Sequence, residues 1–370
     1  MRRILCINTG GLGNLHGSRM RRLTVSLGGE VVYHDLDRCC SPWQTVRALW
    51  KIVREGGPWD LIYQEGTSIL AGACLIRAKM QRGQRFIVSS GDPIGGFFSV
   101  TRGPLSGKAF GVYERQLYRA CAAFIGWTPY LTGMALQMGA RRGVTVEGGA
   151  DLTRFRPLPA EERAEWRARF GLPVDHLVCA VVGSLAWSPR ARYCYGLELV
   201  EALRRMRRTD VSILIVGDGT GRERLQSRVP ADLRSRAVFT GRLDEAGVVG
   251  AMNAADVGFV TQSLDGLGNY RLTTKLPEYL ACGLPVAMSP TPGFYDYVRE
   301  AGWALPPFHP ASAEFHAGCA AWLDKLTVTE ILARRAHARP LAEARFDDRL
   351  LAARFGAFVD DLLREPRENH

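Results

Sequence analysis

Short apolar runs alternate with helix-length segments along almost the whole chain, and this alternation limits the fold more than any other feature. In the first part the strand-like runs lie at residues 3–8, 30–34, 61–64, 86–89, 123–126 and 143–147. A turn or a segment with helical spacing of apolar residues separates each run from the next. Strands that alternate with helices form parallel sheets with crossover helices. The pattern therefore predicts a doubly wound α/β domain over residues 1–150.

The alternation stops at residues 151–171, which are rich in Pro, Arg and Glu, and then begins again. The second series of strand-like runs lies at residues 178–182, 212–216, 237–240, 257–260 and 285–289. We predict a second doubly wound domain over residues 151–345 and a closing helix over residues 346–370. Ligands of such sheets bind beyond the carboxyl ends of the strands, so a ligand shared by both domains would lie between them.

The composition is that of an ordinary folded protein, with 46% hydrophobic and 23% charged residues. No apolar stretch approaches the ~18 residues that span a bilayer, and the basic start runs directly into a strand-like segment. The nine cysteines show no CxxC spacing, which is typical of thiols in a reducing compartment. We expect a cytoplasmic protein without an export signal and without a structural zinc.

The net charge of +11 is concentrated in the first half, where residues 1–150 hold 19 Lys and Arg against 9 Asp and Glu. A basic half suggests an anionic partner, either a phosphorylated small molecule, a membrane surface or a nucleic acid. No nucleic-acid recognition motif accompanies the charge, so we expect no nucleic-acid partner. Because Lys accounts for only five of the 48 basic residues, a compositional bias toward Arg is an equal explanation.

A glycine-rich loop follows the first strand-like run and precedes a helical segment, the context in which backbone amides hold a phosphate. Gly11 and Gly13 fit a dinucleotide fingerprint, but the third glycine position falls on His16. Asp35 and Asp37 come where a ribose-binding carboxylate belongs. The loop thus allows an NAD(P)-dependent oxidoreductase, another phosphate-binding role, or only a tight turn.

The second half carries four segments in an order typical of one enzyme family. Residues 213–219 end a strand in Gly-Asp-Gly, residues 238–243 contain Phe-Thr-Gly, residues 253–257 read Asn-Ala-Ala-Asp-Val, and residues 275–286 read Lys-Leu-Pro-Glu-Tyr-Leu-Ala-Cys-Gly-Leu-Pro-Val. With residues 147–157, which are similar to an interdomain linker, the sequence resembles the family 4 glycosyltransferases. The resemblance implies the GT-B fold, in which two Rossmann-like domains face each other across a cleft. It also implies a nucleotide-sugar (NDP-sugar) on the second domain, an acceptor on the first, and retention of anomeric configuration.

The helix that begins near Thr274 is where a diphosphate would be stabilised by free amides and by the cations Lys275 and Arg271. By resemblance, Glu278 would bind the ribose hydroxyls, although an ion pair with Lys275 is the structural alternative. The full set of expected donor-binding residues is Gly11, Gly13, Arg190, Arg192, Gly217, Gly241, Arg242, Arg271, Thr274, Lys275 and Glu278.

The sequence departs from the family pattern in three places. Tyr270 stands where many members carry a second glutamate, and Arg190 and Arg192 lie in a longer loop where the family has a diphosphate-clamping Arg and Lys. These two arginines either replace the clamp or are solvated. The usual His after the fourth strand is missing, which leaves Asp92 and His16 as the catalytic candidates on the acceptor side. The His and Cys residues show no metal-ligand spacing, and the candidate donor loops contain no D-x-D except Asp35-Leu36-Asp37, so no metal is expected.

Aromatic residues cluster between residues 97 and 130, alongside Arg102, Lys108, Arg115 and Arg119. The mixture suits a face on an anionic membrane, an acceptor groove, or an ordinary packing helix. We expect a cofactor-free, metal-independent transfer from an NDP-sugar to a small-molecule or lipid-linked acceptor, at the inner face of a membrane if this face binds lipid. The alternatives are the NAD(P)-dependent oxidoreductase and a sugar-nucleotide epimerase or binding protein of the same fold.

Overall fold

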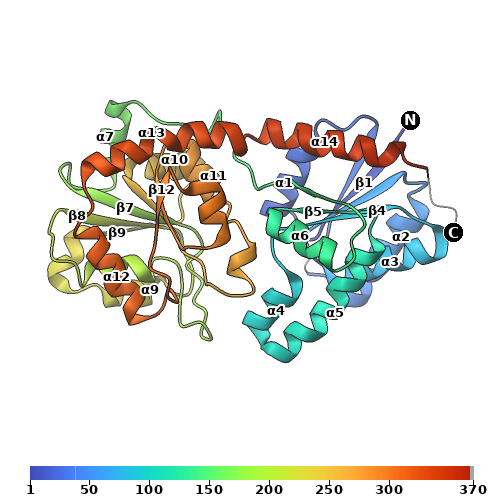
Figure 1. The fold of residues 1–370 in the computed structure, drawn as a ribbon, viewed down its shortest axis with the longest axis horizontal. Coiled ribbons are helices and arrows are strands. Elements are labelled where there is room, and N and C mark those ends of the chain that lie inside the picture. The colour runs from blue at the N-terminus through green and yellow to red at the C-terminus, as the bar shows by residue number, and fades with distance from the viewer. Residues whose placement is uncertain (38, 367–370) are drawn as a thin grey trace. The chain divides into compact units, whose positions relative to one another are not determined.

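Two units make up the chain in the computed structural model, which describes residues 1–37 and 39–366 (Figure 1). Unit 1 comprises residues 1–149, the short segment 270–272 and the chain from residue 348, and unit 2 comprises residues 150–269 and 273–347. Each unit has its own sheet, and both sheets are entirely parallel.

Unit 1 contains a six-stranded sheet in the order β2-β1-β3-β4-β5-β6. Its strands are β1 (Arg3–Asn8), β2 (Glu30–Asp35), β3 (Leu61–Glu65), β4 (Phe86–Ser90), β5 (Ala123–Gly126) and β6 (Gly143–Thr145). Its helices are α1 (Leu15–Thr24), α2 (Pro42–Glu55), α3 (Ile69–Arg82), α4 (Ile94–Arg102), α5 (Pro104–Ala120), α6 (Pro129–Gln137) and α14 (Asp348–Arg364).

The strands of unit 1 contribute side chains to two hydrophobic cores, because successive side chains of a strand point to opposite faces of a sheet. Leu5 and Ile7 belong to the core beneath α2, α3 and α5, whereas Ile4 and Cys6 belong to the core beneath α1 and α14. All four side chains are fully buried. A sheet covered on both faces requires the continuous apolar runs that the sequence shows.

Unit 2 contains a second six-stranded sheet, in the order β12-β11-β10-β7-β8-β9. Its strands are β7 (Leu177–Val182), β8 (Val211–Val216), β9 (Ala237–Gly241), β10 (Val257–Val260), β11 (Val286–Met288) and β12 (Gly302–Ala304). Its α-helices are α7 (Ala160–Arg169), α8 (Leu197–Leu203), α9 (Arg222–Arg228), α10 (Glu245–Ala254), α11 (Lys275–Ala281), α12 (Ala313–Leu323) and α13 (Val328–Arg345), with single helical turns at Ala231–Arg236, Gly268–Tyr270 and Phe294–Val298.

Each sheet has one point where the strand order reverses, and ligands of doubly wound sheets bind there, beyond the carboxyl ends of the strands. In unit 1 this switch point lies between β1 and β3, and in unit 2 it lies between β7 and β10. The loops that follow these four strands are therefore the first places to look for a site.

The two doubly wound sheets predicted from the sequence are confirmed, and every strand-like run is a strand within two residues. Two helices lie between β4 and β5. Helix α4 follows β4 almost directly, although Gly95 and Gly96 are typical of a loop, and the long helix α5 begins at Pro104. The short edge strand β12 was missed, because its three residues Gly302–Ala304 carry no alternation of their own.

Candidate functional site

The glycine-rich loop of unit 1 is held in place by Asn8, the last residue of β1. The side-chain amide of Asn8 donates to the carbonyl of Gly11 (2.8 Å) and to Asp35 (2.6 Å), and its oxygen accepts from the amide of Gly10 (2.9 Å). Gly11 and Gly13 both have positive φ, at 85° and 73°, a conformation that favours glycine. With residues 35–37 the loop lines an open hollow of about 690 Å³.

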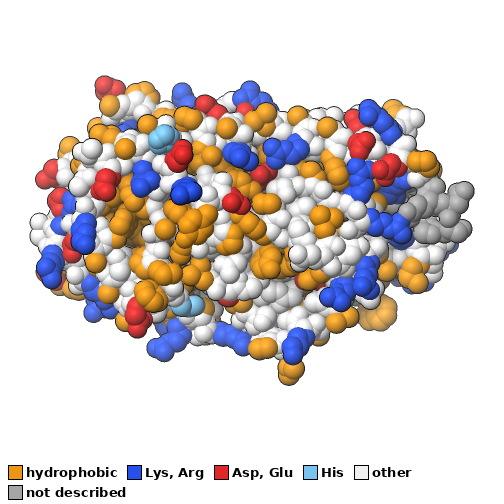
Figure 2. Space-filling model, in the orientation of Figure 1, with side chains coloured by type: hydrophobic (Ala, Val, Ile, Leu, Met, Phe, Trp, Pro, Cys, Tyr) orange, Lys and Arg blue, Asp and Glu red, His pale blue; other side chains and the backbone are white. Residues whose placement is uncertain are grey.

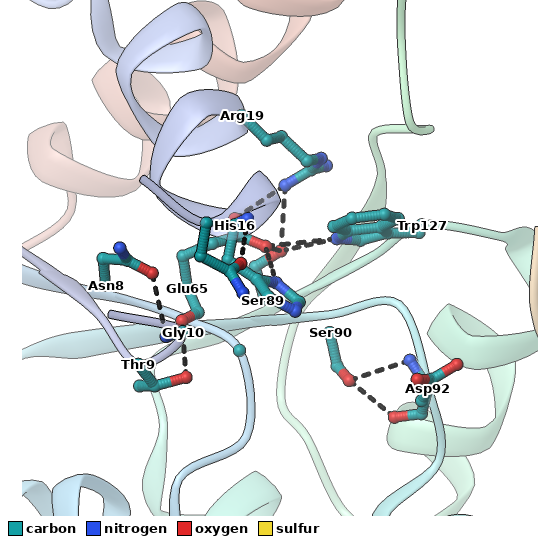
Figure 3. A network of polar contacts seen from close by, with 12 residues as sticks. Asn8, Thr9, Gly10, His16, Arg19, Glu65, Ser89, Ser90, Asp92 and Trp127 are labelled. Carbon is teal, nitrogen blue, oxygen red and sulfur yellow. Dashed lines mark hydrogen bonds and ion pairs between the residues drawn. The ribbon is translucent and has the colours of Figure 1, made fainter. Parts of the chain in front are cut away.

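A buried polar network lies beside this loop at the switch point of the sheet (Figure 3). Glu65 ends β3 and is fully buried, and its Oε2 accepts from Nη1 of Arg19 at 2.7 Å. Its Oε1 accepts from Nε1 of Trp127 and from the hydroxyl of Ser89, both at 3.3 Å. Burial by itself would raise the pKa of Glu65, but the charge of Arg19 lowers it to about 2, so the carboxylate is ionised.

His16 lies in the first turn of α1, directly against this network. Its Nδ1 is 3.6 Å from Oε1 of Glu65, and its ring centre is 5.7 Å from that of Trp127. Nδ1 itself is buried, while a third of the side chain stays exposed. The structure thus places His16, one of the two predicted catalytic residues, at the carboxyl edge of unit 1 with part of its side chain exposed.

Asp92 also lies at this edge, after β4, but to one side of the Glu65 network (Figure 3). Its backbone amide donates to the hydroxyl of Ser90 at 3.1 Å, which fixes the turn before α4. Its carboxylate lies 2.8 Å from Nε of Arg271, and the segment 270–272 belongs to unit 1. The predicted catalytic residue Asp92 and the predicted donor-binding residue Arg271 are therefore paired with each other in this structure.

In unit 2 the predicted glycine turns lie at the carboxyl ends of β8 and β9. Gly217 has φ 134° and Gly241 has φ 72°, and a side chain at Gly217 would collide with the backbone of Gly183. The amide of Gly217 donates to the carbonyl of Gly241 at 2.9 Å, so the two turns are bonded to each other. Arg242 follows directly and is exposed.

The loop after β7 carries Arg190 and Arg192, both exposed. Arg192 has a φ of 51°, the one positive value outside glycine among the described residues. The next residue, Tyr193, anchors the loop, because its hydroxyl donates to Glu198 (2.9 Å) and lies 2.7 Å from the hydroxyl of Thr261. Burial raises the pKa of Glu198, which is fully enclosed beneath this loop. The loop is thus fixed at the switch point of unit 2.

The remaining residues that the sequence predicts for donor binding lie at the start of α11. Nζ of Lys275 is 2.6 Å from Oε2 of Glu278, the ion pair that the sequence offered as the structural alternative. Thr273 already binds the first two amides of this helix: Lys275 donates to its hydroxyl and Leu276 to its carbonyl, both at 3.2 Å. Thr274 forms the N-cap without a side-chain hydrogen bond. The cation of Lys275, and not a free helix end, is therefore the group available to a diphosphate here.

Most of the predicted aromatic cluster is core. Tyr118, Phe124 and Trp127 are buried, and the rings of Phe98 and Phe110 stack at 3.8 Å. A different set forms the exposed face of α5, at helical spacing: Leu105, Lys108, Val112, Arg115 and Arg119. Figure 2 shows basic and hydrophobic side chains together at the tip where α4 meets α5. The packing interpretation is thus right for most of the aromatic residues. On the exposed face of α5, the basic residues alternate with aliphatic side chains and not with aromatic ones.

Two features are absent from residues 1–37 and 39–366. No helix there is long and apolar enough to cross a membrane, and no three His, Cys, Asp or Glu side chains come together as metal ligands. All nine cysteines are free thiols.

Three residues of the unit 1 network were missed from the sequence: Arg19, Glu65 and Trp127. One signal was available, because Glu65 closes an otherwise apolar strand, Leu-Ile-Tyr-Gln-Glu, where a carboxylate is costly to bury. The positions of Arg19 and Trp127 give no such signal, since only the order of the strands brings them to Glu65.

Solved structures with the same fold cover almost the whole chain. HepE of Anabaena, solved in complex with UDP and glucose, is 15% identical with a TM-score of 0.74, over 98% of this chain and 100% of that one. Sucrose-phosphate synthase of Thermosynechococcus elongatus is 16% identical with a TM-score of 0.73, over 98% and 99% of the two chains. The lipopolysaccharide outer core galactosyltransferase WaaB is 14% identical with a TM-score of 0.66, over 97% and 99%. These likenesses confirm the GT-B fold.

The sequence of unit 2 decides the class of protein. Residues 176–324 match the family described as glycosyl transferases group 1. The protein is a glycosyltransferase. A search of the curated proteins gives no match. Within this glycosyltransferase, the matched segment contains every predicted donor-binding residue except Gly11 and Gly13.

Proposed function

We propose that this glycosyltransferase transfers a sugar from an NDP-sugar held by unit 2 to a hydroxyl of an acceptor held by unit 1. The observation that carries the proposal is the family match over residues 176–324, which includes the glycine turns, the arginine loop and α11. HepE, which has the same fold, was also solved with UDP-glucose. Gly11 and Gly13 lie in unit 1, and we propose that their loop contributes to donor binding.

We further propose that the transfer retains the anomeric configuration and needs no metal ion. Retention is supported by the resemblance to family 4. Independence of metal is supported by the cations available to the departing diphosphate, Lys275, Arg190 and Arg192, since fixed positive charges stabilise the negative charge that develops there. Proton NMR of the product's anomeric signal and an assay with EDTA would test the two statements.

A nucleotide screen tests the donor. At a hundredfold excess over its Kd a ligand stabilises the fold by ~2.7 kcal/mol, so UDP, GDP, TDP or ADP should raise the melting temperature clearly. NAD(H) should not, because the fingerprint is interrupted at His16 and both oxygens of Asp35 already bind Asn8 and Arg21. A shift with NAD(H) alone would support an oxidoreductase instead.

Glu278→Ala sharpens this test. If Glu278 binds the ribose hydroxyls, nucleotide binding measured by calorimetry should weaken by ~1.5–3 kcal/mol. The matched control is Glu343→Ala, which removes an exposed glutamate 2.7 Å from Arg339 on α13. Unchanged nucleotide affinity in a folded Glu278→Ala protein would show that Glu278 does not bind the nucleotide and that its role is the ion pair with Lys275.

For the acceptor we propose a molecule at an anionic membrane surface, with the enzyme in the cytoplasm. The exposed face of α5 supports this, because it interleaves Lys108, Arg115 and Arg119 with the 84% exposed Leu105 and the 64% exposed Val112. Basic and aliphatic side chains at helical spacing bind anionic interfaces by charge and by burial together. The one acidic side chain of this helix, Glu114, is buried and accepts from the amides of Ile94 and Gly95.

A further inference from the structure

His16 and Glu65 form a pair at the switch point of the unit 1 sheet. Glu65 is the last residue of β3, and His16 follows the loop that leaves the neighbouring strand β1. Loops at such a point line the ligand crevice of a doubly wound sheet. Of the residues in Figure 3, His16 is the one whose side chain combines an exposed part with a contact to the buried carboxylate.

The charge of Glu65 is already compensated without His16. Arg19, also buried, lies 2.7 Å from Oε2, whereas Nδ1 of His16 lies 3.6 Å from Oε1. Since Coulomb attraction falls with distance, and Arg19 is always charged, Arg19 is the counter-ion of Glu65. The role that remains for His16 is that of a donor aimed at Oε1, at 3.6 Å in this structure.

The geometry decides which ring nitrogen carries the proton. Nδ1 is buried and has no hydrogen-bond partner among the described residues, and the nearest anion is Oε1. If Nδ1 carried a lone pair, that lone pair would face a carboxylate oxygen, which is repulsive. A proton on Nδ1 instead points at an acceptor that Trp127 and Ser89 hold in place at 3.3 Å. Such hydrogen bonds are often long in structures without substrate and shorten when it binds.

We infer that Glu65 is a positioning residue, which holds His16 with its proton on Nδ1 so that Nε2 accepts a hydrogen bond from the acceptor's hydroxyl group. The ligand class is a neutral alcohol or sugar hydroxyl, because a nitrogen with a free lone pair binds a donor and not an anion. The inference rests on the proposed function for the identity of that hydroxyl. The tautomer of His16 does not depend on it.

The tautomer is tested by ¹⁵N NMR of histidine-labelled protein at about pH 8, where a free imidazole is neutral. The His16 signals are assigned by their loss in H16Q. The inference requires the proton on Nδ1 in the wild-type protein. In E65Q the side chain at this position is neutral, so the attraction that favours a proton on Nδ1 is lost and the fraction of His16 with its proton on Nε2 should rise.

E65Q leaves the buried charge of Arg19 uncompensated and could unfold. The second variant therefore combines R19M with E65L, which removes both charges together and is better tolerated than loss of one partner. Without an acceptor at Nδ1, His16 should revert to the Nε2-protonated form that free imidazole side chains prefer. A proton on Nε2 in the wild-type protein, or an unchanged tautomer in the folded double variant, would overturn the inference.

The hydroxyl-binding part is tested with UDP-glucose, or the NDP-sugar of the screen that stabilises the protein most, and with water as acceptor. H16Q should lower the kcat of donor hydrolysis by roughly tenfold, the effect of one hydrogen bond, and leave the Kd of the nucleoside diphosphate unchanged. The matched control is H34Q, at a partly buried histidine of β2, and it should change neither quantity.

The outcomes separate the inference from the proposed function. Hydrolysis by H16Q at the wild-type rate, or a weaker nucleotide Kd in H16Q, would refute a role toward the acceptor hydroxyl. If no nucleotide binds even the wild-type protein, the proposed function fails, whereas the NMR result still decides whether Glu65 positions His16.

Discussion

Asp256 shows how much of unit 2 depends on a single side chain. It belongs to one of the segments that resemble family 4, and its position after α10 brings it to three elements at once. Its Oδ2 accepts from the amide of Val178 (2.9 Å) and from Arg167 (2.5 Å), and its Oδ1 lies 3.4 Å from Arg335 and 3.7 Å from Arg163. The carboxylate therefore ties α7 and α13 to the start of β7. This motif residue has a structural explanation that needs no ligand.

Asp256→Asn should destabilise unit 2 by about 2–3 kcal/mol, because charge-assisted hydrogen bonds in a mostly buried setting are lost. Urea unfolding measures the change. Asp232→Asn, at an exposed position, is the control and should change stability by less than about 0.5 kcal/mol. Equal unfolding midpoints for the two variants would contradict this role of Asp256.

Glu65 gives a pH dependence whose sign follows from its partner. Burial opposes ionisation, but Arg19 prevails and lowers the pKa of Glu65 from 4.5 to about 2. A carboxylate with a lowered pKa stabilises the fold above its unfolded pKa, and this contribution is lost as the pH falls toward the folded value. It amounts to at most about 3 kcal/mol.

The variant with R19M and E65L lacks this contribution, whereas the other carboxylates are common to both proteins. The unfolding free energy of the wild type minus that of the variant should therefore decrease as the pH falls from about 5 to about 3. Urea titrations at several pH values would measure it, and a difference independent of pH would show that Glu65 does not titrate as inferred.

At the scale of elements, α5 has two faces with different tasks. Leu117 and Tyr118 are buried in the core of unit 1, whereas the opposite face exposes Leu105, Lys108 and Val112. Such a helix needs its apolar face for packing, but nothing in the packing requires aliphatic and basic residues to alternate on the exposed face. That face is the reason for proposing an anionic surface as partner.

If the α5 face binds an anionic surface, association should weaken with salt, because exposed charges are screened over a Debye length of ~10 Å at 0.1 M. Co-sedimentation with phosphatidylserine-containing vesicles should fall as NaCl rises from about 50 mM to about 500 mM. The variant changes Arg102, Lys108, Arg115 and Arg119 to Gln and should bind weakly at every salt concentration.

The matched control changes four exposed arginines of unit 2 to Gln: Arg207, Arg234, Arg299 and Arg345. If vesicle binding changes neither with salt nor with either set of substitutions, the basic residues of the first half do not bind an anionic surface.

At the scale of the whole molecule, the chain returns to its first unit at its end. Helix α14 packs beside α1, and its residues Leu351, Phe355, Val359 and Leu362 are buried in the same core as β1 and β3 (Figure 1). Burial of such side chains stabilises a fold by ~1.5–3 kcal/mol each. Their sum is comparable to the 5–15 kcal/mol that typically separates a folded domain from its unfolded state.

Removal of the chain from residue 348 should therefore unfold unit 1 and leave unit 2 folded. Amide hydrogen exchange measures this local unfolding. Protection of the amides should be lost in β1, β3 and β4 and retained in β7 and β8. Phe355→Ala alone should cost about 3–5 kcal/mol, whereas Leu350→Ala on the exposed side of α14 should cost little. Full protection of unit 1 in the truncated protein would show that its core is complete without α14.

The sequence alone determined the two-sheet architecture of this protein and the positions of its glycine turns. Both depend on local information: a strand buried on both faces must be continuously apolar, and a turn with positive φ favours glycine, as at Gly217 and Gly241. The helix α4 escaped prediction because its glycines, Gly95 and Gly96, read locally as a loop. Its start is stabilised by the carboxylate of Glu114, from a different helix.

Only the tertiary structure decided which side chains meet. Arg19, Glu65 and Trp127 lie on separate elements, and the strand order that places β1 beside β3 and β4 beside β5 brings them together. The same holds for Asp92 and Arg271, which are far apart in the sequence and 2.8 Å apart in unit 1. The energy of an isolated charge in a strand is unfavourable, so the sequence marks Glu65 as unusual. Its counter-ion is set by long-range pairing, which no local pattern encodes.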